Sequence, residues 1–455
     1  MKKSSILTAG VLALTLLASS VMAAVSQQEA DKLGTVLTPF GGQKEGNADG
    51  SIPAWTGGLK TNAAPVTNDF IGNPFEGEKP QFVITAANAA QYKDKLTPGQ
   101  MAMFQRYSQT YKIPVYKSQR TASSTQGVYE AVKTSALNTV PVNDGYGLQN
   151  FEKSHYYAFP IPKSGLEVVW NHLTRYRGTS FIQNLIQATP QVNGSYTLVN
   201  VQQSAGFPWQ MKDADPQQSA NILFYVKQEV TAPARMAGNV LLVHETLDQL
   251  KEPRMAWAYS AGQRRVRRAP QVAYDGPGTA ADGLRVADQN DMFNGAPDRY
   301  DWKLIGKKEM YVPYNNYSLF SPKVKYDEII KAGHINQDLT RYELHRVWEV
   351  EGTLKAGERH IYAKRHMYFD EDTWAIVEVD HYDGRGQLWR VGEGFLVNDY
   401  VQGTANYAAV TVYDLIAGRY IVSNLQNENK RGQDYSYRPT MTDFTPAALR
   451  NAGIR

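Results

Sequence analysis

Arginine side chains form the densest group in this 455-residue sequence that could do chemistry. Four of the five residues at 264–268 are arginine. Guanidinium groups bind carboxylates and phosphates through paired hydrogen bonds, so this run could hold an anion. A solvated strand face or a charged guard on a sheet edge is an equally good interpretation. We predict no nucleic-acid partner, because 48 basic side chains stand against 44 acidic ones and leave little attraction for a polyanion.

The arginine run lies in a predicted β-hairpin whose turn is Ala261-Gly262. If this loop has two residues, Trp257 faces Val266 across the strands, and Ala258 faces Arg265. One face of the hairpin is then bulky and aromatic, and the other is small and basic. An error of one residue in the loop would exchange these partners and mix the two faces.

Histidines and carboxylates could supply metal binding or acid–base catalysis. Four of the eight histidines lie in the last third of the chain: His345, His360, His366 and His381. On one strand His360 and His366 would be roughly 20 Å apart, too far to share a metal, although His366 and His381 could meet from neighbouring strands. The acidic groups lie at predicted turns, where Asp commonly binds the local backbone: Asp370-Glu371-Asp372, and Asp380 with Asp383. We predict no metal site and no catalytic residue.

Motifs of the common enzyme classes are missing from the sequence. It has no G-x-S-x-G, no H-E-x-x-H, no Walker loop and no three-glycine dinucleotide motif. It also has no cysteine, which excludes thiol catalysis and thiolate metal sites. These absences favour a protein that is not an enzyme and that needs no cofactor. An envelope hydrolase remains a weaker alternative, with His366 or Asp380 as the place where polar groups would have to converge.

The N-terminus has the features of a secretory signal peptide. Lys2 and Lys3 precede an apolar run over 6–17, and small residues place the cleavage site near Ala23. The following Ala24 is not the cysteine that a bacterial lipoprotein needs, and no later segment has eighteen consecutive apolar residues. We therefore predict residues 1–23 as the signal peptide of a periplasmic protein that has no lipid anchor and no transmembrane segment in its mature chain.

Composition divides the mature chain into three parts. Residues 24–80 are predicted to form an extended arm, because 34–80 contains nine glycines and five prolines together with scattered large apolar side chains. Residues 81–120 are predicted to be helical, with one helix over 86–96 and a second that Thr97-Pro98 begins.

Strand patterns dominate from 121 to 455, and a last short helix is predicted to start at Thr445-Pro446. The expected strands include 166–170, 196–202, 221–230, 240–245, 255–259, 306–312, 342–351, 359–369 and 374–382. Asp383-Gly384 is a further hairpin turn. The fold class is therefore mainly β, a large curved antiparallel sheet with a few covering helices.

Several segments resemble the long, functionally undefined branch of the LolA-like outer-membrane lipoprotein-sorting superfamily. They are the hairpin from Trp257 to Pro270, and the segments 47–58 (NADGSIPAWTGG), 300–308 (YDWKLIGKK) and 382–389 (YDGRGQLW). The resemblance covers most of the mature chain. It implies an incomplete half-barrel with helices over its mouth and an apolar cavity for acyl chains.

What the resemblance implies about function is a non-enzymatic carrier or chaperone for a lipid or another hydrophobic ligand. It also implies association with an export permease of the resistance-nodulation-division type or with an outer-membrane protein. A structural adaptor of such a complex is the alternative. Within the hairpin, Trp257, Tyr259 and Val266 are the candidates for the cavity side. Arg265 and Arg267 are the candidates for contact with a headgroup or partner.

Overall fold

The computed structural model describes residues 24–452, so the predicted signal peptide and its cleavage site lie outside the described residues. Within this range no helix is both long enough and apolar enough to cross a membrane. The helices are α1 (Gln27–Ala30), α2 (Pro98–Arg106), α3 (Gln126–Asn138), α4 (Gly165–Leu173), α5 (Tyr317–Phe320), α6 (Tyr326–Ile329) and α7 (Ala448–Ala452). Short 3-10 helices include η1 (Ala89–Lys95), η5 (Ala287–Gln289) and η8 (Met441–Phe444).

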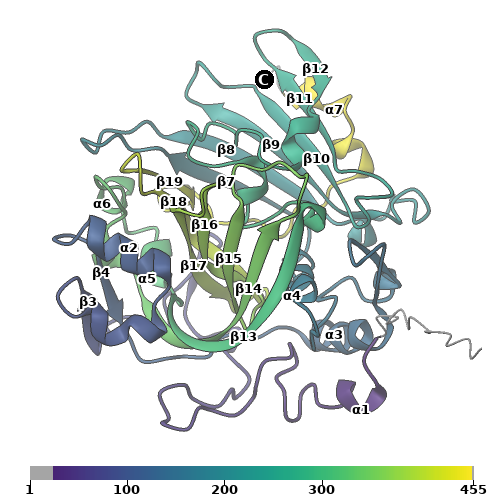
Figure 1. Ribbon diagram of the computed structural model, residues 1–455. Coiled ribbons are helices and arrows are strands. Elements are labelled where there is room, and N and C mark those ends of the chain that lie inside the picture. The colour runs from purple at the N-terminus through teal and green to yellow at the C-terminus, as the bar shows by residue number, and fades with distance from the viewer. Residues whose placement is uncertain (1–23, 453–455) are drawn as a thin grey trace, which may run out of the picture.

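Fifteen strands form one large sheet (Figure 1). Its strands are β3 (Phe82–Thr85), β4 (Lys112–Val115), β7 (Phe181–Ala188), β8 (Val199–Gly206), β9 (Ile222–Ala232), β10 (Val240–Thr246), β11 (Met255–Ser260), β12 (Arg265–Arg268), β13 (Tyr300–Pro313), β14 (Tyr342–Leu354), β15 (Lys364–Asp370), β16 (Ile376–Tyr382), β17 (Leu388–Asp399), β18 (Thr404–Asp414) and β19 (Arg419–Leu425). Two small two-stranded sheets pair β1 (Val66–Thr67) with β2 (Phe70–Ile71) and β5 (Val140–Val142) with β6 (Gly147–Gln149).

The large sheet is open and curved. It runs in the order β12-β11-β10-β9-β8-β7-β19-β18-β17-β16-β15-β14-β4-β3, and β13 pairs with β14 beside this path. All neighbours are antiparallel except β4, which lies parallel to β14. The mainly β fold class that the sequence predicts, a large curved antiparallel sheet with covering helices, is confirmed.

The two faces of the sheet bury two separate cores. On β17, Leu396 packs into the first core, while its neighbours Phe395 and Val397 pack into the second, as alternating side chains of a strand require. Helix α4 covers the first face over β13 and β14, and α2 covers the second over β16 and β17. The names α4 face and α2 face are used below for these two sides.

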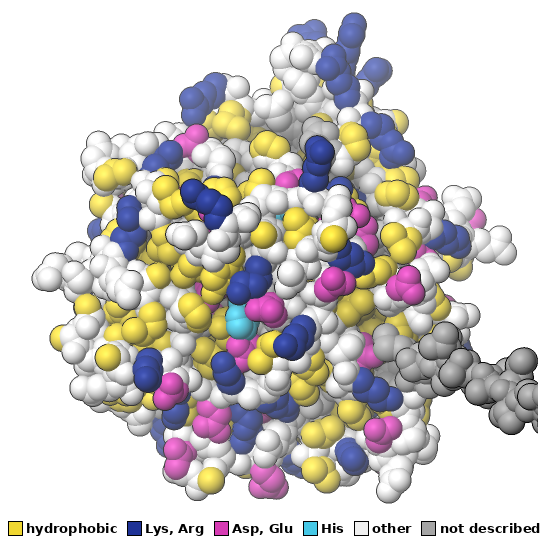
Figure 2. Space-filling view, viewed as in Figure 1, with side chains coloured by type: hydrophobic (Ala, Val, Ile, Leu, Met, Phe, Trp, Pro, Cys, Tyr) yellow, Lys and Arg dark blue, Asp and Glu magenta, His cyan; other side chains and the backbone are white. Residues whose placement is uncertain are grey.

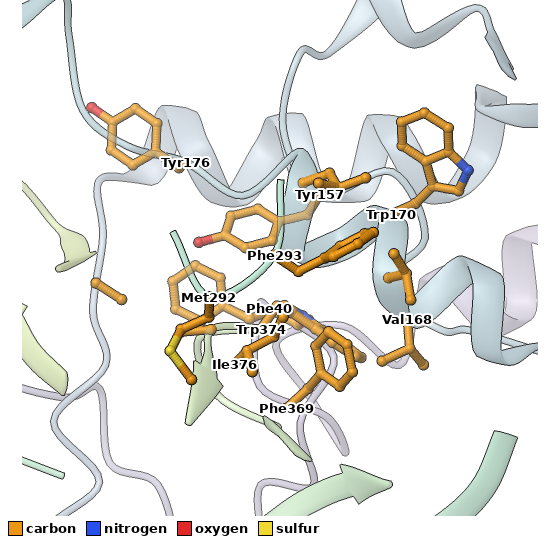
Figure 3. Packing of buried hydrophobic residues seen from close by; sticks show 14 of the residues in the cluster. Phe40, Tyr157, Val168, Trp170, Tyr176, Met292, Phe293, Phe369, Trp374 and Ile376 are labelled. Carbon is orange, nitrogen blue, oxygen red and sulfur yellow. The ribbon is translucent and has the colours of Figure 1, made fainter. Parts of the chain in front are cut away.

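The core on the α4 face is filled by side chains from segments far apart in the sequence (Figure 3). Trp170 of α4, Phe369 of β15 and Trp374 of the following turn meet there, together with Phe40 from the N-terminal arm. The Trp374 indole N–H donates to the Phe40 backbone carbonyl at 2.8 Å. The arm runs along the bottom of the view in Figure 1, and this bond ties it to the sheet.

Two of the predicted helices are present: α2 begins at its predicted cap, and α7 lies at its predicted position. Helix α2 begins after Thr97, whose hydroxyl accepts from the Gln100 backbone N–H while the Gln100 side chain accepts from Thr97, and Pro98 is its first residue. Helix α7 follows Thr445-Pro446 within two residues. The first predicted helix is shorter and tighter, the 3-10 helix η1. The segment 81–120 also contributes two strands, β3 and β4, to the sheet.

Two predictions of secondary structure were wrong after residue 121. The segment 166–170 is helix α4 and not a strand, and α3 is a helix inside the region expected to be all strand. In α4 the hydroxyl of Ser164 accepts from the backbone N–H of Glu167, which fixes the first turn. Its Val168-Val169 pair favours a strand locally, but burial of Trp170 and Leu173 at helical spacing outweighs that preference.

The hairpin β11–β12 has a different register from the predicted one. Its loop has four residues, 261–264, and Arg264 adopts the left-handed conformation with φ 51°. Trp257 therefore pairs with Arg268, and Tyr259 pairs with Val266. Because the register moved by two residues, each side chain stays on its predicted face: the aromatic residues share one side, and Arg265 and Arg267 share the other.

Candidate ligand-binding cavity

A cavity lies on the α4 face, between strands β7 to β10 and the irregular segment 272–294 that crosses over them. Its empty volume is about 1370 Å³ when the solvent at its open mouth is included. The cavity thus lies beside the part of the sheet that α4 covers, over strands that this irregular segment crosses.

An apolar row crosses the floor of the cavity from strand to strand. Phe181 of β7 pairs with Ala205 of β8, which pairs with Val226 of β9, which in turn pairs with Val243 of β10. All four line the cavity. The hydrophobic effect would hold a hydrocarbon chain against such a row.

A parallel row of amides lies two residues further along the same strands. Gln183, Gln203 and Gln228 stand opposite one another on β7, β8 and β9 and line the cavity. Gln228 donates to the Gln203 side-chain oxygen at 2.7 Å, and Gln426 donates to that of Gln183 at 3.3 Å. The lining is therefore amphipathic, more polar than the apolar cavity that the resemblance implies.

Two arginines and one aspartate close one end of the cavity. Arg175 and Arg177 pair with Asp291 at 2.5 Å and 2.9 Å. Burial raises the pKa of the Asp291 carboxyl, but the two arginines outweigh burial and hold this pKa well below its ordinary value. The neighbouring His172 is neutral, because burial and Arg175 lower its pKa to about 3. This end therefore carries one more positive than negative charge.

Arg285 enters the cavity lining from the covering segment. Its guanidinium donates to the Ser423 hydroxyl at 3.4 Å and to the Gln187 side-chain oxygen at 3.3 Å. No carboxylate of the described residues lies within ion-pair distance of it. Burial lowers its pKa to about 10, so the group is still charged at neutral pH. A charged group in this position has hydrogen-bonding capacity left over for a ligand.

The side chains of the hairpin that the sequence singled out do not line this cavity. Tyr259 is buried in a cluster with Phe444 and Leu449 of the C-terminal segment, and Trp257 and Val266 pack against the same cluster. The Arg268 guanidinium lies 4.9 Å from the centre of the Trp257 ring. A ligand-binding role for these three side chains stays a prediction.

Arg265 and Arg267 are exposed at the tip of the hairpin, where basic side chains gather at the top of Figure 2. They are on the cavity side of the sheet, because Arg267 pairs with Ala258 and Ala258 pairs with the cavity residue Leu241. They lie beyond the lining of the cavity. Their contact with a headgroup or partner also stays a prediction.

A buried acidic cluster occupies the α2 face. Glu378 and Asp380 of β16 and Glu393 of β17 are fully buried beneath α2, and Gln100 of α2 donates to Glu378 at 2.9 Å. Burial raises the pKa of both Asp380 and Glu393 to about 7. None of the three lines the cavity. Polar groups thus converge around Asp380, the place named for the hydrolase alternative, and helix α2 covers them.

A second buried cluster, His345, Asp370 and Asp372, brings one ligand atom of each residue within 4.8 Å of the others. Arg120 already binds Asp372 through two hydrogen bonds, of 2.7 Å and 2.8 Å. The His345 ring is hydrogen-bonded to Glu343 at 3.0 Å.

His366 and His381 do not meet. His366 pairs across the sheet with Asp380, whereas His381 pairs with Arg365 and so points to the opposite face.

The features that build the cavity were not visible in the sequence. Gln183, Gln203 and Gln228 come together only through the pairing of three strands, and Arg285 lies in a loop whose path the sequence does not specify. The predicted strand 196–202 overlaps β8, but no strand was predicted where β7 lies. Which face was hollow depended on what covered it.

Comparisons with known proteins place the chain in a family. An uncharacterized protein of Pseudomonas aeruginosa is 62% identical over 457 residues, which cover 100% of both chains. The crystal structure of a DUF1329 family protein from Desulfovibrio piger covers 63% of this chain and 97% of its own, at 15% identity and a TM-score of 0.44. The crystal structure of a LolA superfamily protein from Nitrosomonas europaea covers 62% of this chain and 98% of its own, at 13% identity and a TM-score of 0.38.

The family model described as "Protein of unknown function (DUF1329)" matches residues 83–450, from strand β3 to helix α7. Apart from Phe82, the first residue of β3, this match spans the large sheet, and it includes the whole cavity lining. The chain therefore belongs to the DUF1329 family, and the resemblance to a long branch without a defined function is confirmed.

Proposed function

We propose that this protein is a periplasmic, non-enzymatic carrier for a lipid or another amphiphile, which it holds in the cavity on the α4 face. The observation that carries the proposal is a cavity of about 1370 Å³, its open mouth included, with an apolar floor and a polar, positively charged lining. A hydrocarbon chain lying along Phe181, Val226 and Val243 would keep its polar end near the glutamine row.

Burial of a hydrocarbon chain can supply the binding energy of such a carrier. Each buried methylene contributes roughly 0.8 kcal/mol, so a dozen would contribute about 10 kcal/mol before the costs of association and ordering. Release would need a partner that competes for the same ligand. A resistance-nodulation-division permease or an outer-membrane protein is the partner class that we propose on the sequence resemblance.

Native mass spectrometry of the protein purified from the periplasm tests the carrier function. We expect a copurified adduct of lipid size that denaturing conditions remove. An empty chain bound to a transporter component would favour the structural adaptor instead. Finding the protein outside the periplasm would contradict the proposed location.

A pair of variants tests which side of the sheet binds the ligand. Phe181→Ala removes an aromatic ring from the cavity floor, whereas Trp257→Ala removes one from the cluster under the C-terminal segment. We expect Phe181→Ala to weaken uptake of a fluorescent fatty acid by about tenfold. If the ligand lies in the cavity, Trp257→Ala should lower the urea midpoint while leaving uptake within about twofold. The reverse pattern would assign the ligand to the hairpin side chains.

A further inference from the structure

The charges that line the cavity are strongly unequal. Its lining holds four arginines and one acidic residue: Arg175, Arg177, Arg254, Arg285 and Asp291. Three of the arginines have carboxylate partners, since Asp291 serves two of them and Glu245 pairs with Arg254 at 2.7 Å. Within residues 24–452 the remaining one, Arg285, has two long side-chain hydrogen bonds, to Ser423 and Gln187, and no ion pair.

A buried guanidinium without an ion-pair partner lowers the stability of the fold unless a counter-ion binds to it. A buried charge is normally paired, and removing it from water without a partner costs several kcal/mol. Guanidinium offers five N–H donors in a planar fork that matches a carboxylate or phosphate. Protein surrounds the Arg285 side chain, yet it keeps some surface toward the cavity. An anion reaching it from the cavity would pair the charge without displacing an internal partner.

The neutral polar groups nearby favour the same kind of ligand. The Gln183, Gln203 and Gln228 amides offer N–H donors and carry no charge that would compete for Arg285. The apolar row from Phe181 to Val243 lies beside them on the same strands. The cavity thus presents a cationic site and an apolar floor to one molecule.

We propose that the cavity selects amphiphiles with an anionic head, a carboxylate or a phosphate, which Arg285 binds while the hydrocarbon lies on the apolar row. This inference rests on the proposed carrier function and specifies the ligand class. It differs from the headgroup contact predicted at Arg265 and Arg267, which lie outside the lining.

Probes that share one hydrocarbon chain but differ in their head groups test the preference for an anionic head separately from the carrier function. Binding of dodecanoate, dodecyl phosphate, dodecan-1-ol and dodecyltrimethylammonium is measured on the full mature chain by displacement of a fluorescent fatty acid. Inorganic phosphate alone is the control for a free anion. We expect the two anionic amphiphiles to bind about tenfold more tightly than the alcohol, and the cation to bind most weakly.

Variants of two arginines assign the preference. We expect Arg285→Gln to abolish the advantage of the anionic probes and to leave dodecan-1-ol binding within about twofold, while Arg285→Lys retains part of the advantage. Arg267→Gln tests the alternative headgroup contact at the hairpin, which lies on the same side of the sheet but beyond the lining. Arg385→Gln, on the exposed turn after β16 and outside the lining, is the control that should change nothing. Should Arg285→Gln fail to fold, the wild-type salt dependence remains as a test, because salt should weaken dodecanoate binding and spare the alcohol.

Four outcomes would overturn the inference. Equal binding of anionic and neutral probes, or an anionic preference that survives Arg285→Gln, would remove Arg285 from ligand recognition. Loss of the preference in Arg267→Gln alone would move the head to the hairpin. Inorganic phosphate that binds as tightly as dodecyl phosphate would indicate a free-anion site without a hydrocarbon. Failure of all four dodecyl probes to bind the wild type would instead contradict the carrier function itself.

Discussion

Asp380 should make the stability of this protein fall as the pH rises through neutrality. Its carboxyl is fully buried beneath α2, and burial raises its pKa from 3.8 to about 7, against the lowering effects of the Gly99 backbone, His366 and Lys364. The folded state therefore keeps a proton that the unfolded chain has already released. The stabilising effect is complete below about pH 4 and is lost as the pH rises to the folded-state pKa.

The size of the effect follows from this difference in pKa. One unit corresponds to about 1.4 kcal/mol, so Asp380 alone should lower the free energy of unfolding by about 3 kcal/mol between about pH 5 and about pH 8.5. Asp370 and Glu393, whose pKa values burial also raises to about 7, act in the same direction. Carboxyls with a lowered pKa, such as Asp291, titrate below this window. Buried histidines with a lowered pKa, such as His172, act in the opposite direction between about pH 5 and about pH 6.5, so the Asp380 effect is read from the difference between the wild type and a variant.

Urea unfolding of the wild type and of Asp380→Asn across this pH range is the assay. We expect the free energy of unfolding of the variant to fall less steeply with pH than that of the wild type, by most of the contribution of Asp380. At about pH 8.5 the variant should be more stable than the wild type. Asp327→Asn, at an exposed position of α6, is the matched control and should follow the wild type. An unchanged pH dependence in Asp380→Asn would refute the reasoning.

Two further changes test how segments are held on the sheet. Gly99→Ala should lower the free energy of unfolding by about 1–3 kcal/mol, measured by urea unfolding. The added Cβ would lie 2.1 Å from an Asp380 oxygen and 2.8 Å from Val391. An unchanged urea midpoint would show that α2 can shift freely. Trp374→Phe removes the donor to the Phe40 carbonyl. We expect the free energy of unfolding to fall by about 1–3 kcal/mol and proteolysis within residues 24–80 to become faster. Equal cleavage rates in variant and wild type would show that this bond does not hold the arm.

The sequence predicted a large antiparallel sheet correctly, because the residues that identify a single strand lie within that strand and its flanking turns. Alternation and turn residues identify strands such as β10 and β16, and a capping box identifies α2. Local information failed where burial decided the outcome. Ser164 and Glu167 have the spacing of a helix start, yet the valines between Glu167 and Trp170 favoured a strand.

The candidate site was harder to predict than the fold. The aromatic face of the hairpin was predicted correctly as a face, but the sequence could not show that Phe444 and Leu449, nearly two hundred residues later, cover it. Conversely, Arg285 looks like any surface arginine in sequence. Its position becomes distinctive only because the covering segment carries it over β7 and β19, where no acidic side chain of the described residues pairs with it.

The covering segment owes its position to polar bonds at its far side. Asp288 forms a buried ion pair with Arg365 at 2.5 Å, Gln289 binds the His381 ring at 3.0 Å, and Arg390 donates to the Gly283 carbonyl at 2.7 Å. Met292 and Phe293 add apolar anchors in the core on the α4 face (Figure 3). These bonds hold both flanks of Arg285 on β15 to β17, while Arg285 itself lies over the cavity. A ligand could thus reach a fixed cation from the cavity without opening the segment.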